Sequence, residues 1–159
     1  MMYWTKFWDI NSEGGIFKAE MDGTNAVEIV SGVVWPESIA IDFDSQRLFW
    51  TDEFVDKIQS SNLDGTDVQL VLQLSSAAGP SGIVVTDERI FWGNSITKSL
   101  QSSDKAGHDI VTLYDGGYSI RHLAIAPQNL VQTRPNHCEK QMCSGGVCVL
   151  NRNSFRCVV

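Results

Sequence analysis

The stretch Phe49-Trp50-Thr51-Asp52 decides the fold, because two similar stretches flank it along the chain. Tyr3-Trp4-Thr5-Lys6 precedes it and Phe91-Trp92-Gly93-Asn94 follows it. The three tryptophans are therefore 46 and 42 residues apart. An aromatic pair that returns at a nearly constant spacing indicates a structural unit that is copied along the chain.

Two further landmarks recur in the same order as this aromatic stretch. The copies of the first are Met21-Asp22-Gly23-Thr24, Leu63-Asp64-Gly65-Thr66 and a weaker Asp104-Lys105-Ala106-Gly107. The copies of the second are Trp35-Pro36-Glu37-Ser38-Ile39, Gly79-Pro80-Ser81-Gly82-Ile83 and a weaker echo at 118–125. Three landmarks in a constant order indicate three repeats within residues 1–126.

Each copy is predicted to contain four short β-strands. In the middle copy these strands cover residues 38–43, 47–51, 57–62 and 67–72, and Asp64-Gly65 forms a hairpin turn. Apolar residues alternate in short runs, and no segment has a convincing helical period. Four strands per about 40–45 residues is typical of a β-propeller blade, where aromatic side chains fill the wedge between neighbouring sheets. We therefore expect an all-β fold of about three blades.

The four cysteines form a separate cluster at the end of the chain. They are Cys138, Cys143, Cys148 and Cys157. An even number in a short, glycine-containing segment favours disulfides made in an oxidising compartment. A zinc site is the alternative, although it would favour Cys-x-x-Cys pairs. The spacing alone leaves three disulfide pairings open.

The quoted residues resemble the class B (YWTD) repeats of the low-density lipoprotein receptor family, followed by an EGF-like module. The middle copy is the most similar, whereas Lys6 replaces the aspartate of the motif in the first copy and Gly93 and Asn94 replace its last two residues in the third. The resemblance implies the last three repeats of a six-bladed propeller at 1–130, and a truncated EGF-like module at 131–159.

The same resemblance implies further details. It pairs Cys138 with Cys148 and Cys143 with Cys157, and it leaves out the third EGF disulfide. It also makes residues 120–126 the strand that returns to the inner edge of the first blade. We expect the missing blades to come from an upstream segment. The alternatives are a half ring that is unstable by itself and a head-to-tail homodimer.

Composition excludes several classes of function. Twelve basic and nineteen acidic residues give a net charge of −7, which is unfavourable for binding nucleic acid or an anionic membrane. The sequence has no apolar run of 18 residues, and we expect neither a transmembrane segment nor a signal peptide in it. No nucleophile motif, metal-ligand spacing or phosphate-binding loop is present, so we expect no catalytic residue, metal site or cofactor.

One rim of the predicted propeller collects aromatic and charged residues that suit a protein ligand. They are Trp8, Trp35, Glu37, Glu53, Phe54, Asp56, Tyr118 and Arg121. Packing between blades would explain the same residues. His122 and His137 are candidate pH sensors, because histidine titrates at the pH of endosomes.

These observations predict a non-catalytic, extracellular ligand-binding and spacer region of a lipoprotein-receptor-like, single-pass membrane receptor. The resemblance implies endocytosis and ligand release at acidic pH, at the cell surface or in the endosome lumen. A Wnt co-receptor-like signalling platform and a nidogen-like matrix adaptor are the alternatives. The expected partner is a protein, which is a lipoprotein, a secreted signalling protein or a matrix protein.

Overall fold

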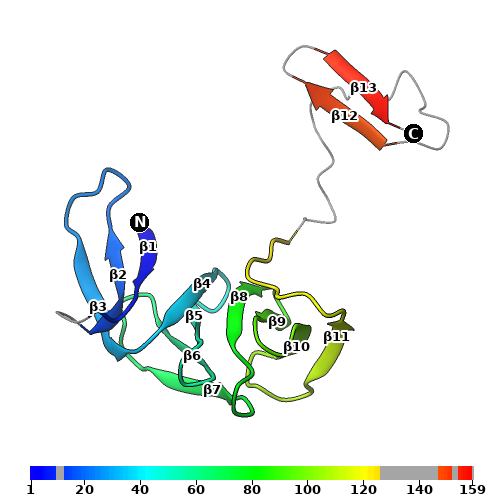
Figure 1. Ribbon diagram of the computed structural model, residues 1–159. Coiled ribbons are helices and arrows are strands. Elements are labelled where there is room, and N and C mark those ends of the chain that lie inside the picture. Colours follow the sequence, from blue (N-terminus) through cyan, green and yellow to red (C-terminus); the bar gives the residue numbers. More distant parts are fainter. Residues whose placement is uncertain (10–12, 126–146, 152–153, 159) are drawn as a thin grey trace. The chain divides into compact units, whose positions relative to one another are not determined.

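The computed structural model of the chain describes residues 1–9, 13–125, 147–151 and 154–158, with side chains as far as Ile125. The chain divides into two compact units, Met1–Ile125 and Ala126–Val159. All regular elements in the described part are β-strands (Figure 1). The all-β prediction is confirmed.

Three antiparallel sheets lie next to one another in the first unit (Figure 1). Blade 1 contains β1 (Met2–Lys6), β2 (Gly14–Ala19) and β3 (Val27–Val33). Blade 2 contains β4 (Pro36–Asp42), β5 (Arg47–Asp52), β6 (Lys57–Asn62) and β7 (Gln69–Gln73). Blade 3 contains β8 (Pro80–Val85), β9 (Arg89–Asn94), β10 (Ser99–Asp104) and β11 (Val111–Asp115). In each blade the strands follow one another in sequence order, as expected for a meander.

The turn before the outer strand has the same backbone in all three blades. The amides of Gly23, Gly65 and Gly107 each donate to a carbonyl three residues earlier, and all three glycines have a positive φ. Gly107 is thus the counterpart of Gly65, and the aspartate of the landmark is replaced by Ala106. The third copy of this landmark is shifted by one residue from the match that the sequence suggested.

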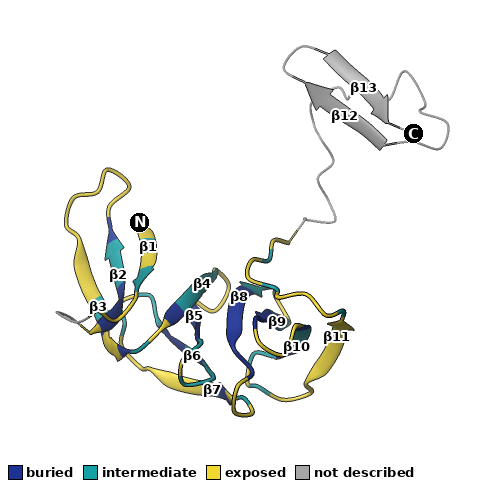
Figure 2. Cartoon of the chain, viewed as in Figure 1, coloured by how far each residue is buried: buried dark blue, intermediate teal, exposed yellow. Residues whose placement is uncertain are grey.

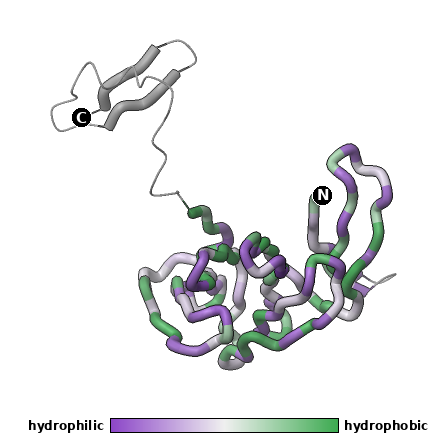
Figure 3. The backbone as a smooth tube through the Cα atoms, turned by 180° about the vertical axis from the view of Figure 1, so that it is seen from behind, coloured by the Kyte–Doolittle hydropathy of each residue, from purple (hydrophilic) through white to green (hydrophobic). Residues whose placement is uncertain are grey.

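Apolar side chains are concentrated between the blades. Trp50 is fully buried with Ile16 and Val30 of blade 1, and Trp92 is fully buried with Phe49 and Ile58 of blade 2. Burial is strongest in β5, the second strand of blade 2, and in β8, the first strand of blade 3, while β11 is exposed (Figure 2). Hydrophobic and hydrophilic residues alternate in short stretches along the backbone, as this layered packing requires (Figure 3). Trp50 and Trp92 therefore each fill the wedge towards the preceding blade.

The returning strand at 120–126 is not found. Residues 120–125 form no strand, and Ala126 lies outside the described residues. β1 pairs with β2 alone among the described strands, so blade 1 has three strands and no inner strand. The sequence prediction was wrong here because β1 and residues 120–125 lie at opposite ends of the row of blades (Figure 1).

The second unit is described only by a hairpin of β12 (Val147–Asn151) and β13 (Ser154–Val158). Its backbone register places Cys148 opposite Cys157. Cys138, Cys143 and His137 lie outside the described residues, and so do both predicted disulfides. In the part of the chain that the structure describes, no helix has the length and apolarity to cross a bilayer.

Candidate functional site: a rim hollow between the blades

Thr51 and Asp52, the last two residues of the motif, connect blade 2 to its neighbours. The Thr51 hydroxyl donates to the Ser81 carbonyl of blade 3 at 2.6 Å. The buried Asp52 carboxylate accepts the amide hydrogens of Val34 and Trp35, at 2.9 and 3.1 Å, on the link from blade 1. These residues hold the rim of the propeller in place, which is a structural role.

The third copy replaces both residues and uses different contacts. Asn94 is fully buried and donates from Nδ2 to Ser99 and Gln101, at 3.0 and 2.9 Å, while its Oδ1 has no partner. The link into blade 3 is held by Asp56 of blade 2, which accepts the amide hydrogens of Ala77 and Gly79, both at 2.8 Å. The Asp56 carboxylate therefore performs for blade 3 the task that Asp52 performs for blade 2.

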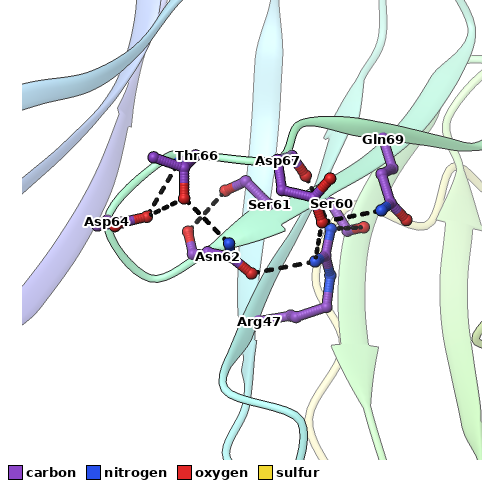
Figure 4. A network of polar contacts seen from close by, with 8 residues as sticks. All are labelled: Arg47, Ser60, Ser61, Asn62, Asp64, Thr66, Asp67 and Gln69. Atoms are coloured by element: carbon purple, nitrogen blue, oxygen red, sulfur yellow. Dashed lines mark hydrogen bonds and ion pairs between the residues drawn. The ribbon is translucent and has the colours of Figure 1, made fainter.

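A polar network stabilises the turn of blade 2 next to its outer strand (Figure 4). Arg47 forms an ion pair with Asp67 at 2.8 Å and also donates to Asn62 and Ser60. The hydrogen bond from Arg47 lowers the pKa of Asp67. Arg89 repeats part of this arrangement in blade 3. This network connects strands of one blade and leaves the rim free for other contacts.

Six of the eight rim residues that the sequence predicts line one open hollow of about 690 Å³. They are Trp35, Glu37, Glu53, Phe54, Asp56 and Arg121. They come from the link before β4, the start of β4, the turn after β5 and the segment after β11, which line the same hollow. Phe54 is 69% exposed, and Trp35 is 45% exposed with its ring 5.6 Å from that of Phe7. The hollow thus offers aromatic surface to a partner.

The charges of the hollow are mainly negative. Arg121 Nη1 lies 3.3 Å from Glu37 Oε1 and 3.9 Å from Glu53 Oε2. Glu53 also accepts a hydrogen bond from the Ser95 hydroxyl of blade 3. The lining includes the carboxylates of Glu37, Glu53 and Asp56 and the guanidinium of Arg121, so it has an excess of two negative charges. An aromatic surface with this charge is complementary to a basic, partly apolar ligand.

The remaining two predicted residues are not part of the hollow. Trp8 and Tyr118 are exposed, at 57% and 77%, and neither lines it. The sequence prediction missed Phe7, Ala77 and Ile96, which do. Ile96 stands 42 residues after Phe54, so alignment of the repeats would have found it. Phe7 stands 46 residues before Glu53, so the same alignment would have found it, whereas Ala77 aligns with no predicted rim residue.

The structure gives fewer observations on the predicted histidine pH sensors and on metal binding. His122 is exposed, and its backbone lies against Gly82 of β8. Its role as a pH sensor stays a prediction. Among the residues that the structure describes, no group of three His, Cys, Asp or Glu residues is arranged to hold a metal ion.

Comparison with curated proteins finds similarity to two insect receptors. The chain is 40% identical over 72 residues to the vitellogenin receptor of Solenopsis invicta, and 37% identical over 73 residues to the vitellogenin receptor Yl of Drosophila melanogaster. Each match covers 45% of this chain and 4% of the receptor. The chain thus corresponds to a small part of these receptors. No family model matches the sequence.

Solved structures show the same propeller architecture. A chain of a nidogen/laminin complex matches with a TM-score of 0.65 and 25% identity, over 74% of this chain and 45% of that one. A luciferin-regenerating enzyme matches with a TM-score of 0.59 and 11% identity, over 75% and 42%. The second likeness shows the fold alone. Both solved chains extend well beyond the part that this chain matches.

Proposed function

Since this chain carries YWTD repeats of the low-density lipoprotein receptor family, we propose that its rim hollow binds a protein ligand in the extracellular region of a receptor. The observation that supports this most directly is the gathering of Trp35, Phe54 and their acidic neighbours around one opening. Exposed aromatic side chains beside charged groups are frequent among the residues that dominate protein interfaces. The role is binding, without catalysis.

The chemistry of the hollow indicates which ligand segment fits. A lysine or arginine could approach Glu37 and Glu53, which Arg121 neutralises only in part. An apolar neighbour of that residue would contact Phe54 and Ile96, which are both more than half exposed. We therefore expect a loop of the ligand in which a basic residue stands beside an apolar one.

The wider assignment follows the family. We expect an endocytic, single-pass receptor with a six-bladed propeller and an EGF-like module, in which His122 and His137 contribute to release at acidic pH. Blades from the rest of a longer polypeptide would complete the ring. A signalling platform like the Wnt co-receptors and a matrix adaptor like nidogen are the alternatives.

The test is binding of purified probe proteins to the immobilised chain. Vitellogenin is the probe for the endocytic assignment, because the two relatives are named as its receptors. A laminin fragment is the probe for the matrix alternative, because nidogen and laminin form the matching complex. Phe54→Ala should weaken the binding at least tenfold, since it removes the exposed aromatic ring that the apolar residue of the ligand would contact.

Phe43→Ala is the matched control. Phe43 is 75% exposed in the turn between β4 and β5 of the same blade, outside the hollow. It should leave both binding and thermal stability unchanged. Equal losses in the two variants would show that the hollow is not the binding site. Binding of neither probe by the folded wild-type chain would contradict both assignments.

A further inference from the structure

A second pocket lies between blades 2 and 3 and shares no residue with the rim hollow. Its volume is about 370 Å³, which is within the range of about 300–1,000 Å³ for small-molecule sites. Seven of its ten lining residues carry a hydroxyl, amide or carboxylate group, and none is basic. We call it the junction pocket. Its lining suits a ligand that is polar and carries no negative charge.

The backbone register places the junction pocket inside the row of blades. Gln101 lies opposite Trp92, and Thr112 lies opposite Gln101, so the three side chains share one face of blade 3. Trp92 packs on Phe49 and Ile58, and this face is therefore turned towards blade 2. The end of β7 and the link after it supply the other side. Both blades have four strands in the described part, so the pocket does not depend on the residues at either end of the chain.

A buried hydrogen-bond network fixes part of the lining. Asn94 is fully buried and donates from Nδ2 to Ser99 Oγ at 3.0 Å and to Gln101 Oε1 at 2.9 Å. Gln101 in turn donates from Nε2 to Thr112 Oγ1 at 3.2 Å. The Thr112 oxygen is therefore the acceptor, and its hydroxyl hydrogen has no acceptor among the described residues. This hydrogen is available to a ligand.

Two acceptors line the same pocket. The Asp115 carboxylate receives no hydrogen bond from the part of the chain that the structure describes. Gln73 donates from Nε2 to the carbonyls of Val55 and Asp56, at 3.1 and 3.2 Å, which leaves its Oε1 as an acceptor. One donor and two acceptors match neighbouring hydroxyl groups of a ligand, because each hydroxyl both donates and accepts hydrogen bonds.

The third repeat differs from the second at the residues of this network. Asn94 and Thr112 stand 42 residues after Asp52 and Leu70, so blade 2 has a carboxylate and an apolar side chain at the two places. The arrangement in blade 3 also leaves the buried Asn94 Oδ1 without a partner, which costs stability. Local arrangements that cost stability are expected mainly at functional sites. The departure from the motif therefore supports a role for the pocket.

We propose that the junction pocket binds a neutral sugar ring, either as a free sugar or as the end of a glycan. Thr112 donates to one hydroxyl of the ring, Asp115 and Gln73 accept from its neighbours, and the side chains of Leu74 and Ile110 contact the C–H groups. The absence of a basic lining residue disfavours a phosphate or sulfate group. The proposal does not depend on the ligand hollow.

The test is a titration of the ¹⁵N-labelled 159-residue chain with the methyl glycosides of mannose, galactose, glucose and N-acetylglucosamine. We expect at least one of them to shift the backbone amide signals of Gln101 and Thr112 in a saturable way and to leave that of Phe54 unchanged. Thr112→Val should weaken this binding at least tenfold, since it removes the available donor with little change of shape. Thr112→Ser keeps the hydroxyl and should keep the binding.

The acceptor side has its own pair of variants. Asp115→Asn should weaken the binding at least fivefold, because an amide oxygen is a weaker acceptor than a carboxylate. Asp109→Asn is the matched control, since it makes the same change of charge at an exposed residue just before β11, outside the pocket. A well-dispersed spectrum that no glycoside changes would overturn the proposal. Equal shifts with glycerol would overturn it as well, since the pocket would then not recognise a ring.

A glycopeptide that ends in the bound sugar distinguishes the two sources. Tighter binding than that of the methyl glycoside would support the end of a glycan, and equal or weaker binding would support a free sugar. Shifts that persist after the sugar has been removed enzymatically from the glycopeptide would overturn the proposal, since the pocket would then recognise the peptide.

Discussion

At the scale of single residues, restoring the motif should destabilise the third repeat. Asn94 stands where the motif has aspartate, but its amide donates two hydrogen bonds in a fully buried place. Asn94→Asp removes both donors and buries a charge, while the link amides that an aspartate would accept are already held by Asp56. We expect a loss of roughly 1–3 kcal/mol in the free energy of unfolding, measured with urea.

The matched variant is Asp52→Asn in blade 2. It weakens hydrogen bonds that the motif residue accepts, whereas Asn94→Asp removes hydrogen bonds that it donates. It should also destabilise the chain, since Asp52 accepts hydrogen bonds from Val34 and Trp35. If Asn94→Asp instead raised the unfolding free energy, an aspartate at the motif position would have the same role in blades 2 and 3. The conclusion that Asp56 holds the link into blade 3 in its place would then be wrong.

The ion pair between Asp42 and Lys105, at 2.6 Å, predicts how stability depends on pH. Burial of Asp42 opposes ionisation, but hydrogen bonds from Lys105 and Ser45 outweigh it and lower the pKa of the carboxyl. The folded-state pKa is therefore below the unfolded value of about 3.9. The stabilisation is present above that value and is lost as pH falls through it towards the folded pKa.

Asp42→Asn should consequently lower the free energy of unfolding at neutral pH, by roughly 1.5–3 kcal/mol for a hydrogen bond between charged groups. The difference from wild type should shrink below pH of about 4, because the wild-type carboxyl then becomes protonated. Urea unfolding at several pH values measures this. A difference that stays constant with pH would mean that the charge of Asp42 contributes nothing.

At the scale of elements, substitutions at two turn glycines distinguish the energetic cost of a clash between blades from the cost of backbone strain. Gly65 and Gly23 have φ of 87° and 84°, so alanine strains both by about 1–2 kcal/mol. Only at Gly65 would the new methyl group meet the neighbouring blade, at the Ile29 carbonyl. Gly65→Ala should therefore destabilise the dilute chain by about 1–3 kcal/mol more than Gly23→Ala. Equal losses of stability in the two variants, measured by thermal denaturation, would indicate that blade 1 moves away from the new methyl group at no cost.

Strands were predictable wherever their pattern is local. The strand at 57–62 was predicted with its observed bounds, because a polar loop precedes it and the Asp64-Gly65 turn follows it. The strand at 47–51 was predicted within a residue, because its aromatic run marks it directly. The rim hollow was predictable in outline, since strand order alone brings the turn after β5 and the links together. Of the residues that were missed, Phe7 and Ile96 align with predicted rim residues, whereas Ala77 depends on how the link before β8 packs, which the repeats do not encode.

At the scale of the whole molecule, the returning strand could not be predicted because its pairing partner lies far away in the fold. Residues 120–125 carry the landmark of an inner strand, but a strand forms only where another edge satisfies its backbone groups. β1 offers such an edge at the other end of the row of blades (Figure 1). Sequence therefore specifies what kind of strand the segment can become, and assembly decides whether it forms.

This dependence on neighbours predicts a gradient of local stability, measurable by hydrogen exchange on the dilute chain. Blade 2 is covered on both faces, so amides of β5 and β6 should exchange slowest. The open inner edge of β1 and residues 120–125 should exchange fastest, because their amides have no strand partner among the described residues. Uniform protection across the three blades would contradict the gradient and would show that the row unfolds as one cooperative unit.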